Sequence, residues 1–350
     1  MKKKCALITV LMLAAFLSAR GQQRNGTYSF LDITDSPRVA ALGGSITSIA
    51  DGDIQLALFN PSLIDSSMHN ALSLAYVDYF TDVNFGMVQY ARHFNKIGSF
   101  AASLQYHNYG KFDYADQSGA ATGGTFSAAD YNFVLGWGRR LNPHFSIGAN
   151  VKFVGNQYED YNAFALAVDV AGTYYSQKGW TLSVAGRNIG MELYGNYDGP
   201  RADLPFHLQA SISKRLEHVP FRFIITYNDI QKWDLTYDDP LDLENEIDPI
   251  TGEKKNKTGL AKFGDKMMRH LVFGGEIYIG KNVTLRVSYN YKRRQDMKSP
   301  EKKGMVGFSY GLSVHIYKFD ISYSRAEMHN VGAPNYFSIT TNIERFTKNR

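Results

Sequence analysis

The chain has 350 residues, a net charge of +5, one cysteine, and 44% hydrophobic and 14% aromatic residues. Its 31 glycines, 10 prolines and 20% charged residues exclude a low-complexity, disordered or collagen-like chain. The length allows two ordinary domains or one large barrel.

Residues 1–21 have the features of a secretory signal. Three lysines at positions 2–4 precede an apolar run over residues 5–17, and small residues follow at Ala19 and Gly21. This run is shorter than the roughly 20 apolar residues that a transmembrane helix needs. We therefore predict cleavage before Gln22.

Removal of this signal changes which partners the composition allows. Four basic residues and no acidic ones are lost, so the net charge falls from +5 to +1, and the only cysteine is lost as well. A nearly neutral chain has no electrostatic attraction for nucleic acid. Without cysteine, the mature chain has no disulfide, thiolate zinc site or cysteine nucleophile. We expect no metal and no cofactor, because the nine histidines form no compact ligand motif.

Residues 22–70 form a segment that differs from the rest of the mature chain. Gly43 and Gly44 permit a tight approach of the backbone to its surroundings. Residues 53–59 are predicted to form a short helix that ends at Asn60, before Pro61. We predict that the segment is a hatch in or near the lumen of a barrel, with a periplasmic tail as the alternative.

Residues 71–346 show alternating apolar and polar residues, which is the pattern of strands with two different faces. Most of the runs are about 9–12 residues long, the length that a tilted strand needs to cross a bilayer. The strands are centred near residues 75, 87, 104, 134, 150, 168, 184, 210, 224, 274, 288, 309, 321 and 339. The sequence therefore predicts an all-β, antiparallel transmembrane barrel of about 14 strands.

The connections favour a membrane barrel over a soluble β-sandwich. Alternate connections are short, and these cover residues 93–98, 139–144, 176–179, 216–220, 280–282 and 315–316. The others are long, apart from a short first one at Thr81-Asp82, and they cover residues 110–127, 157–161, 190–205, 229–266, 293–304 and 325–334. Outer-membrane barrels have short periplasmic turns and long extracellular loops. We expect both termini in the periplasm and the long loops outside the cell.

The strand pattern also assigns charged residues to the lumen. If the apolar faces contact lipid, the inward charges have both signs: Lys152, Arg187, Arg222, Arg286 and Lys318 with Asp169, Glu276 and Asp320. Mixed charges favour a plugged interior with salt bridges over a pore selective for one ion sign.

The longest connection, residues 229–266, is the first candidate for binding a partner. Aromatic residues are enriched at interface cores, which nominates Trp233 and Tyr237, together with the adjacent Asp238 and Asp239. A solvated loop without a partner is the alternative. A lysine-rich strip at residues 293–303 is an equally plausible docking site.

One motif suggests an enzyme, but its context does not. Residues 307–311 read GFSYG, which matches the nucleophile pattern around Ser309. That motif requires a sharp strand-to-helix turn, whereas here a predicted strand continues through it. We therefore predict that the protein is not an enzyme, and an outer-membrane hydrolase is the least favoured reading.

The N-terminal segment contains the residues that carry a family resemblance. The run ALGG, IADGD and LFNPSLI, which includes Gly43, Gly44, Asn60 and Pro61, resembles the hatch of the FadL-like outer-membrane family of fourteen-stranded barrels. More narrowly, the mature chain resembles the PorQ-like barrels of the type IX secretion system of Bacteroidota. That resemblance extends from residue 36 to 343 and includes FRFIITYNDIQKWDLTYDDP and SYNYKRRQDMK.

The narrower resemblance implies a non-enzymatic component of a surface attachment complex. Its partners would be a PorZ-like surface protein with PorU and PorV, in a complex that processes cargo and attaches it to lipopolysaccharide. Membrane lipid and lipopolysaccharide would surround the barrel. The alternative is a FadL-like transporter of small hydrophobic molecules, although the mostly polar set of predicted lumen residues favours the scaffold.

Overall fold

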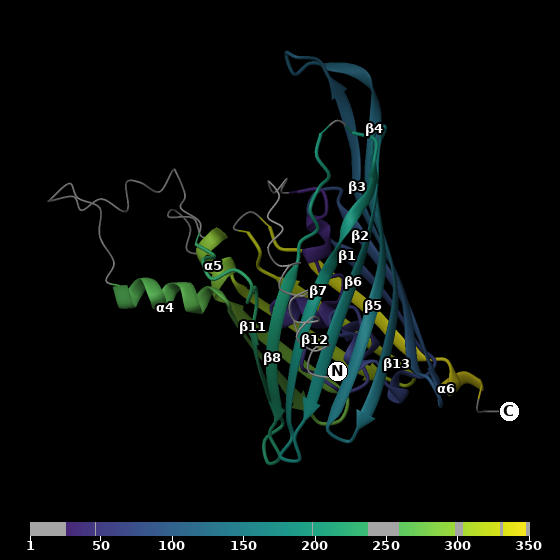
Figure 1. Ribbon diagram of the computed structural model, residues 1–350, viewed down its shortest axis with the longest axis vertical. Helices are drawn as coiled ribbons and strands as arrows, with labels where there is room; N and C mark the ends of the chain where they lie inside the picture. Colours follow the sequence, from purple (N-terminus) through teal and green to yellow (C-terminus); the bar gives the residue numbers. More distant parts are fainter. Residues whose placement is uncertain are drawn as a thin grey trace, which may run out of the picture.

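A computed structural model describes residues 26–45, 47–197, 199–236, 259–297, 304–329 and 332–347. The predicted signal peptide lies outside these residues. Figure 1 shows one tall barrel whose interior is occupied by the N-terminal segment. Among the described residues, no helix combines the length and the apolar character that crossing a bilayer requires.

Fourteen antiparallel strands close into a barrel in which every strand pairs with its neighbour in sequence. The strands are β1 (Ala71–Asp78), β2 (Asn84–Phe94), β3 (Gly98–Ala115), β4 (Ala121–Asn142), β5 (Phe145–Tyr158), β6 (Tyr161–Tyr175), β7 (Trp180–Gly195), β8 (His207–Arg215), β9 (Phe221–Tyr227), β10 (Leu271–Ile279), β11 (Val283–Asn290), β12 (Phe308–Ile316), β13 (Phe319–Ala326) and β14 (Asn335–Asn342). The barrel closes where β1 pairs with β14, with Ala71 opposite Asn342. Every predicted strand centre lies inside an observed strand, which confirms the predicted fold class.

The outward surface of the barrel is apolar, as the alternating sequence predicts. On β3, Leu104 and Tyr106 are exposed, whereas the intervening Ser103, Gln105 and His107 are buried in the interior. Aromatic rings pack on one another at both rims: Tyr106 and Tyr131 lie 5.1 Å apart near the long-loop end, and Phe145 and Tyr174 lie 4.9 Å apart at the short-turn end. An apolar belt bordered by aromatic rings is typical of outer-membrane barrels.

Two predicted features of the connections are wrong. Residues 110–127 are mostly strand, because β3 and β4 continue as a hairpin that rises far above the other strands (Figure 1). Glycine and polar residues interrupt the alternating pattern here, so the sequence does not indicate this pairing. The register shifts between Asn108 and Lys111 and between Asp113 and Ala115 interrupt it further. The segment at residues 157–161 is likewise only a tight turn between β5 and β6.

The alternating pattern predicts no helix in the long connections, whereas the described part of these connections contains two. They are α4 (Gly259–Arg269), after β9, and α5 (Tyr291–Met297), which directly follows β11. The apolar stripe of α4 consists of only three large residues interrupted by glycine and lysine, so it is too short to stand out as a sustained helical period.

Residues 26–70 pass through the lumen from one end to the other. Gly26 lies beside the β1–β2 connection at the long-loop end, and residue 70 leads into β1 at the short-turn end. The segment has one short α-helix, α2 (Pro37–Ala41), and single 3₁₀ turns that include η2 (Ile54–Leu56), η3 (Pro61–Leu63) and η4 (Ser66–Met68). The predicted helix at residues 53–59 is reduced to the η2 turn. The described chain thus begins at the long-loop end, whereas α6 (Glu344–Thr347) follows β14 at the short-turn end.

Candidate functional site

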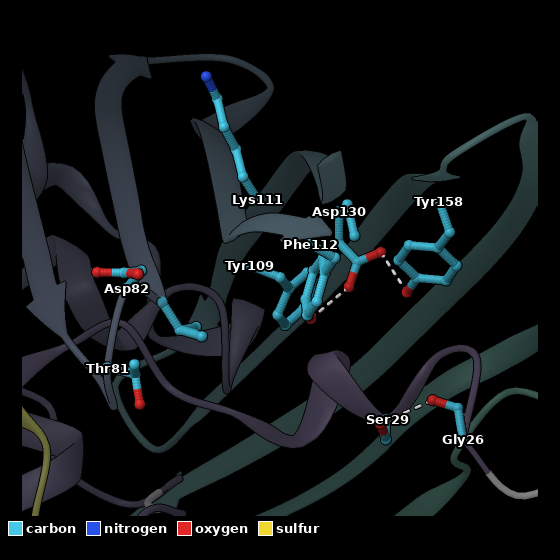
Figure 2. Close-up of a pocket in the computed structure, with 11 residues that line it drawn as sticks. Gly26, Ser29, Thr81, Asp82, Tyr109, Lys111, Phe112, Asp130 and Tyr158 are labelled. Carbon is cyan, nitrogen blue, oxygen red and sulfur yellow. Dashed lines mark hydrogen bonds between the residues drawn. The ribbon is translucent and has the colours of Figure 1, made fainter. Parts of the chain in front are cut away.

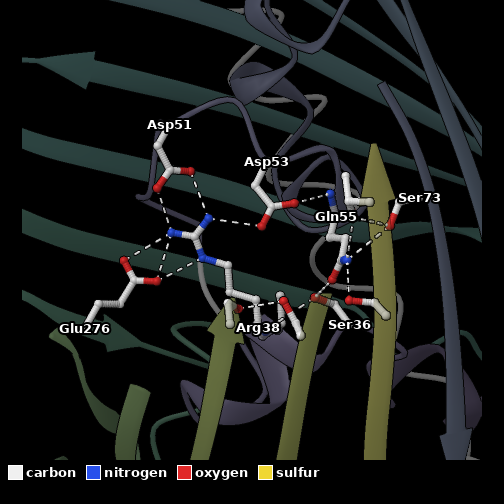
Figure 3. A network of polar contacts seen from close by, with 12 residues as sticks. Ser36, Arg38, Asp51, Asp53, Gln55, Ser73 and Glu276 are labelled. Carbon is white, nitrogen blue, oxygen red and sulfur yellow. Dashed lines mark hydrogen bonds and ion pairs between the residues drawn. The ribbon is translucent and has the colours of Figure 1, made fainter. Parts of the chain in front are cut away.

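A buried network of ion pairs fixes the hatch to the barrel wall. The guanidinium of Arg38, on α2, donates to Asp51 at 2.9 Å, to Asp53 at 3.0 Å and to Glu276 of β10 at 3.0 Å (Figure 3). Arg38 and Glu276 are both almost fully buried. The hatch thereby supplies both positive and negative side chains to an ion-pair network that also includes Glu276 of the barrel wall.

Two further arginines of the wall complete this network. Arg222 donates to Glu276 at 2.8 Å and to Asp51 at 2.8 Å, and Arg286 donates to Glu276 at 2.8 Å. Three guanidinium groups therefore surround one carboxylate that has no access to solvent. Buried charges are tolerated only when they are paired and hydrogen-bonded, which makes Glu276 the centre of the network.

The inward charges of the strands follow the predicted pattern. Lys152 of β5 forms an ion pair with Asp169 of β6 at 2.8 Å and donates to Asn188 at 2.7 Å, and all three are buried. Arg187 is also buried, whereas Lys318 and Asp320 lie partly exposed at the short-turn end. The lumen is therefore filled by the hatch and by salt bridges of mixed sign.

The Asn60-Pro61 pair of the hatch rests on glycines of the barrel wall. A β-carbon added at Gly148 would lie 2.3 Å from the carbonyl carbon of Pro61, and one at Gly138 would lie 2.5 Å from the Pro61 oxygen. The side chain of Asn60 accepts from the Ser62 amide at 2.9 Å and donates to Thr173 of β6 at 3.0 Å. Only glycine permits backbone to approach backbone at this distance.

The Gly43-Gly44 pair makes a second close contact with the wall. Both residues have left-handed backbone conformations, with φ of +98° and +93°. A β-carbon at Gly43 would lie 2.3 Å from a methyl carbon of Val272, on β10, and one at Gly44 would lie 3.1 Å from the Arg293 guanidinium. The four nominated hatch residues therefore lie at two places where the hatch touches the barrel.

At the long-loop end, a cavity of about 570 Å³ opens between the hatch and the wall. It is bordered by the start of the hatch, the β1–β2 connection and strands β3 to β5, and its lining residues include Tyr109, Phe112, Asp130 and Tyr158 (Figure 2). The buried carboxylate of Asp130 accepts from Tyr109 at 2.5 Å and from Tyr158 at 2.6 Å. Both hydroxyls are thus engaged by Asp130, and the rest of the lining combines Phe112 with polar residues that include Asp82 and Lys111.

Aromatic side chains continue from this cavity into the lumen. The ring of Tyr109 lies 6.3 Å from that of Phe85, which stacks on His107 at 4.0 Å. His107 in turn lies 5.4 Å from Phe30 of the hatch and 3.0 Å from the buried carboxylate of Asp35. The sequence pattern did not single out these residues, because the series joins side chains of β2, β3 and the hatch that lie apart in the sequence.

The nominated partner-binding residues are described only in part. Trp233 lies in the connection after β9, is 48% exposed, and packs its ring 5.5 Å from that of Phe263 in α4. Tyr237, Asp238 and Asp239 lie outside the described residues. Of the lysine-rich strip at residues 293–303, the first five residues belong to α5.

The serine of the GFSYG motif lies within the wall. Ser309 is the second residue of β12, is fully buried, and accepts a long hydrogen bond of 3.4 Å from Arg293. The strand continues beyond it, so the strained turn of a nucleophile is not formed. No group of histidine, aspartate and glutamate residues in the described part of the chain is arranged to hold a metal.

The sequence matches no protein-family model and none of the curated proteins with which it was compared. Its structure is similar to that of the Pseudomonas putida toluene transporter TodX, with a TM-score of 0.54 and 10% identity over 89% of this chain and 99% of that one. It is also similar to CymD, a monoaromatic hydrocarbon channel, with a TM-score of 0.50 and 11% identity over 89% of this chain and 96% of that one. A Pseudomonas aeruginosa FadL homologue aligns over 88% of this chain and 98% of that one, with a TM-score of 0.47 and 11% identity.

These likenesses concern the fold. The likeness to TodX and CymD agrees with the closed antiparallel barrel of fourteen strands seen here. The role in the type IX secretion system, which the resemblance to PorQ-like barrels implies, stays a prediction.

Proposed function

We propose that the protein is a non-enzymatic outer-membrane channel that admits small hydrophobic molecules. The observation that carries the proposal is the cavity at the long-loop end, with the series of packed aromatic rings that leads from it to the hatch. In this proposal the long loops face the outside of the cell and the short turns face the periplasm. The fold likeness to TodX and CymD, which are described as a toluene transporter and a monoaromatic hydrocarbon channel, supports the same ligand class.

The cavity suits an apolar or aromatic solute. Its volume of about 570 Å³ falls within the roughly 300–1,000 Å³ typical of small-molecule sites. Aromatic rings bind other rings through offset or edge contacts. The Asp130 carboxylate accepts hydrogen bonds from the hydroxyls of Tyr109 and Tyr158 and from the Asn156 amide, so its acceptor sites are occupied within the protein. The lining also includes Asp82 and Lys111, one charge of each sign, so it does not select a ligand of one charge.

Entry beyond this cavity requires a change in the hatch. The series Tyr109, Phe85 and His107 ends against Phe30, which belongs to the hatch and is buried. A ligand that follows these rings therefore meets residues 26–70 before it reaches the short-turn end. The proposed pathway is binding at the mouth, followed by a displacement of part of the hatch.

The test is uptake of a hydrophobic aromatic fluorophore, N-phenylnaphthylamine, by Gram-negative cells that produce the protein. We expect the wild-type chain to raise the initial rate of uptake above that of cells without it. Replacing Phe112 with alanine removes a ring from the cavity and is expected to slow uptake about two- to tenfold, the range that corresponds to one aromatic contact of about 0.5–1.5 kcal/mol.

Tyr114 provides the matched control. It lies two residues further along β3, is an exposed aromatic residue like Phe112, and does not line the cavity. Replacing Tyr114 with alanine should leave uptake unchanged. Equal uptake with and without the wild-type protein, at equal amounts of folded barrel, would contradict the channel function.

Surface anchoring is the second candidate, and the sequence resemblance to PorQ-like barrels supports it. In that function the barrel holds a PorZ-like surface protein, with PorU and PorV, in the complex that attaches cargo to lipopolysaccharide. The exposed ring of Trp233, at the start of the longest connection, is consistent with a docking surface there.

A pull-down of the tagged chain in mild detergent distinguishes the two functions. If the protein is an anchor, a large surface protein is expected to co-purify and to be lost when residues 240–258 are deleted. Recovery of the barrel alone in both cases would argue against anchoring, and it would leave the uptake experiment unaffected.

A further inference from the structure

Helix α4 is amphipathic, and among the described residues its apolar face is only partly covered, by the Trp233 ring against Phe263. Leu260, Phe263 and Met267 follow one another at spacings of three and four residues, so they lie on one side of the helix. They are 84%, 52% and 43% exposed. Exposed large apolar residues that form a contiguous stripe indicate a surface that contacts something other than water.

The opposite face of α4 is held by polar contacts to neighbouring connections. Lys266 forms an ion pair with Asp234 at 2.6 Å, and this contact lowers the pKa of the Asp234 carboxyl below its usual range. Arg269 forms an ion pair with Asp296 of α5 at 2.8 Å, and Asp265 accepts from Tyr291 at 2.7 Å. These contacts fix the rotation of the helix about its axis.

The position of α4 places its free face near the membrane. In Figure 1 the helix runs sideways from the rim of the barrel, across the direction of the strands, with α5 above it. The last residue of the helix, Arg269, is separated from β10 only by His270. The helix therefore ends at the long-loop end of a membrane-crossing strand. Because the polar face is tied to α5, which lies above α4 in Figure 1, the apolar face points away from α5.

We propose that α4 lies in the membrane interface, with Leu260, Phe263 and Met267 among the acyl chains of the leaflet at the long-loop end. An amphipathic helix parallel to the bilayer with large apolar residues on one side is the usual form of an interfacial anchor. Trp233, which packs on Phe263, is a residue type enriched at this depth. The exposed Lys262 on the polar side is suited to the phosphate groups of the headgroup layer.

We assign lipid as the partner of the apolar face of α4, because the helix adjoins the lipid-facing surface of the barrel. The outward residues of the strands that follow α4, among them Ile277 and Val287, are exposed and apolar. Helix α4 leads into β10, so its free face lies beside the long-loop edge of that surface. This inference does not depend on the proposed channel function.

The test uses fluorophores at single cysteines, since the sequence has no cysteine after Cys5. The mature chain carrying Leu260→Cys, labelled with a nitrobenzoxadiazole dye, is reconstituted in vesicles of phosphatidylcholine and phosphatidylglycerol that contain a lipid with a nitroxide on its acyl chain. We expect quenching by the nitroxide lipid several-fold stronger than that of dye at Lys262→Cys, with the reverse order for aqueous iodide. Met267→Cys gives a second position on the same face if the first variant folds poorly.

Folding of each labelled variant is checked by heat-modifiable gel mobility. The proposal is overturned if lipid quenching at positions 260 and 267 does not exceed that at position 262. In that outcome the apolar face is in water in a pure lipid bilayer, and its partner is a protein instead.

Discussion

Replacing Glu276 with glutamine is expected to lower the free energy of unfolding by about 3–5 kcal/mol, the cost of breaking a buried ion pair. The substitution keeps the shape of the side chain but leaves Arg38, Arg222 and Arg286 with one carboxylate fewer in a region without solvent. The measurement is unfolding in urea, followed by the loss of the fast-migrating folded form on gels. The fraction of folded barrel should fall at lower urea concentrations than in the wild type.

A control at the surface separates this effect from a general loss of charge. Glu327 pairs with Arg325 at 3.0 Å, and both side chains are partly exposed. Exposed pairs contribute about 0–1 kcal/mol, so Glu327→Gln should change the free energy of unfolding by no more than that. If the two variants unfold at the same urea concentration, the network around Arg38 does not hold the hatch in the way described here.

The second large effect is expected at Gly148. Its substitution by valine places a β-carbon 2.3 Å from the carbonyl carbon of Pro61, which the wall cannot accommodate without moving the hatch. Valine is favourable in a strand, so the barrel itself should still form. We expect the hatch to leave this contact and become accessible from outside.

Accessibility of the hatch is measured at Ser62, which is buried beside Pro61. In a Ser62→Cys background, Gly148→Val should raise the rate of reaction with a water-soluble maleimide about tenfold or more, since overpacking costs about 1–3 kcal/mol. Gly155→Val is the matched control, because Gly155 lies on the same strand and a β-carbon there meets nothing within 4 Å. A cysteine at position 62 that stays unreactive in the Gly148→Val protein would show that the hatch is not displaced.

The strands of the barrel could be predicted because their signal is local. Each crosses an environment that is apolar on one side and polar on the other, so alternation alone places all fourteen centres. The same reasoning placed Lys152, Arg222, Arg286, Asp169 and Glu276 inside the barrel. It gave neither the partner of each charge nor the role of Glu276. Alternation does not give the register between neighbouring strands, and Arg38 comes from the distant hatch.

The predictions that were wrong concern segments whose local composition favours one structure and whose tertiary contacts favour another. Residues 110–127 contain glycine, serine and aspartate that favour loops, yet pairing between β3 and β4 extends the sheet through most of them. Helix α4 was missed because its stripe is short. The cavity was missed for another reason: Tyr109, Asp130 and Tyr158 come from three strands, and the pairing of β3 with β4 and of β4 with β5 brings them to one place.

The pairing of β1 with β14 has a consequence for the order of folding. Residues 26–70 immediately precede β1, yet the wall that encloses them is complete only when residues 335–342 arrive from the other end of the chain. Contacts between such distant segments form slowly. Until they form, the sheet has two open edges that are prone to pair with other chains. The hatch is therefore expected to assemble against an unclosed sheet, from which it can still dissociate. When β14 pairs with β1, the barrel closes and the hatch is enclosed.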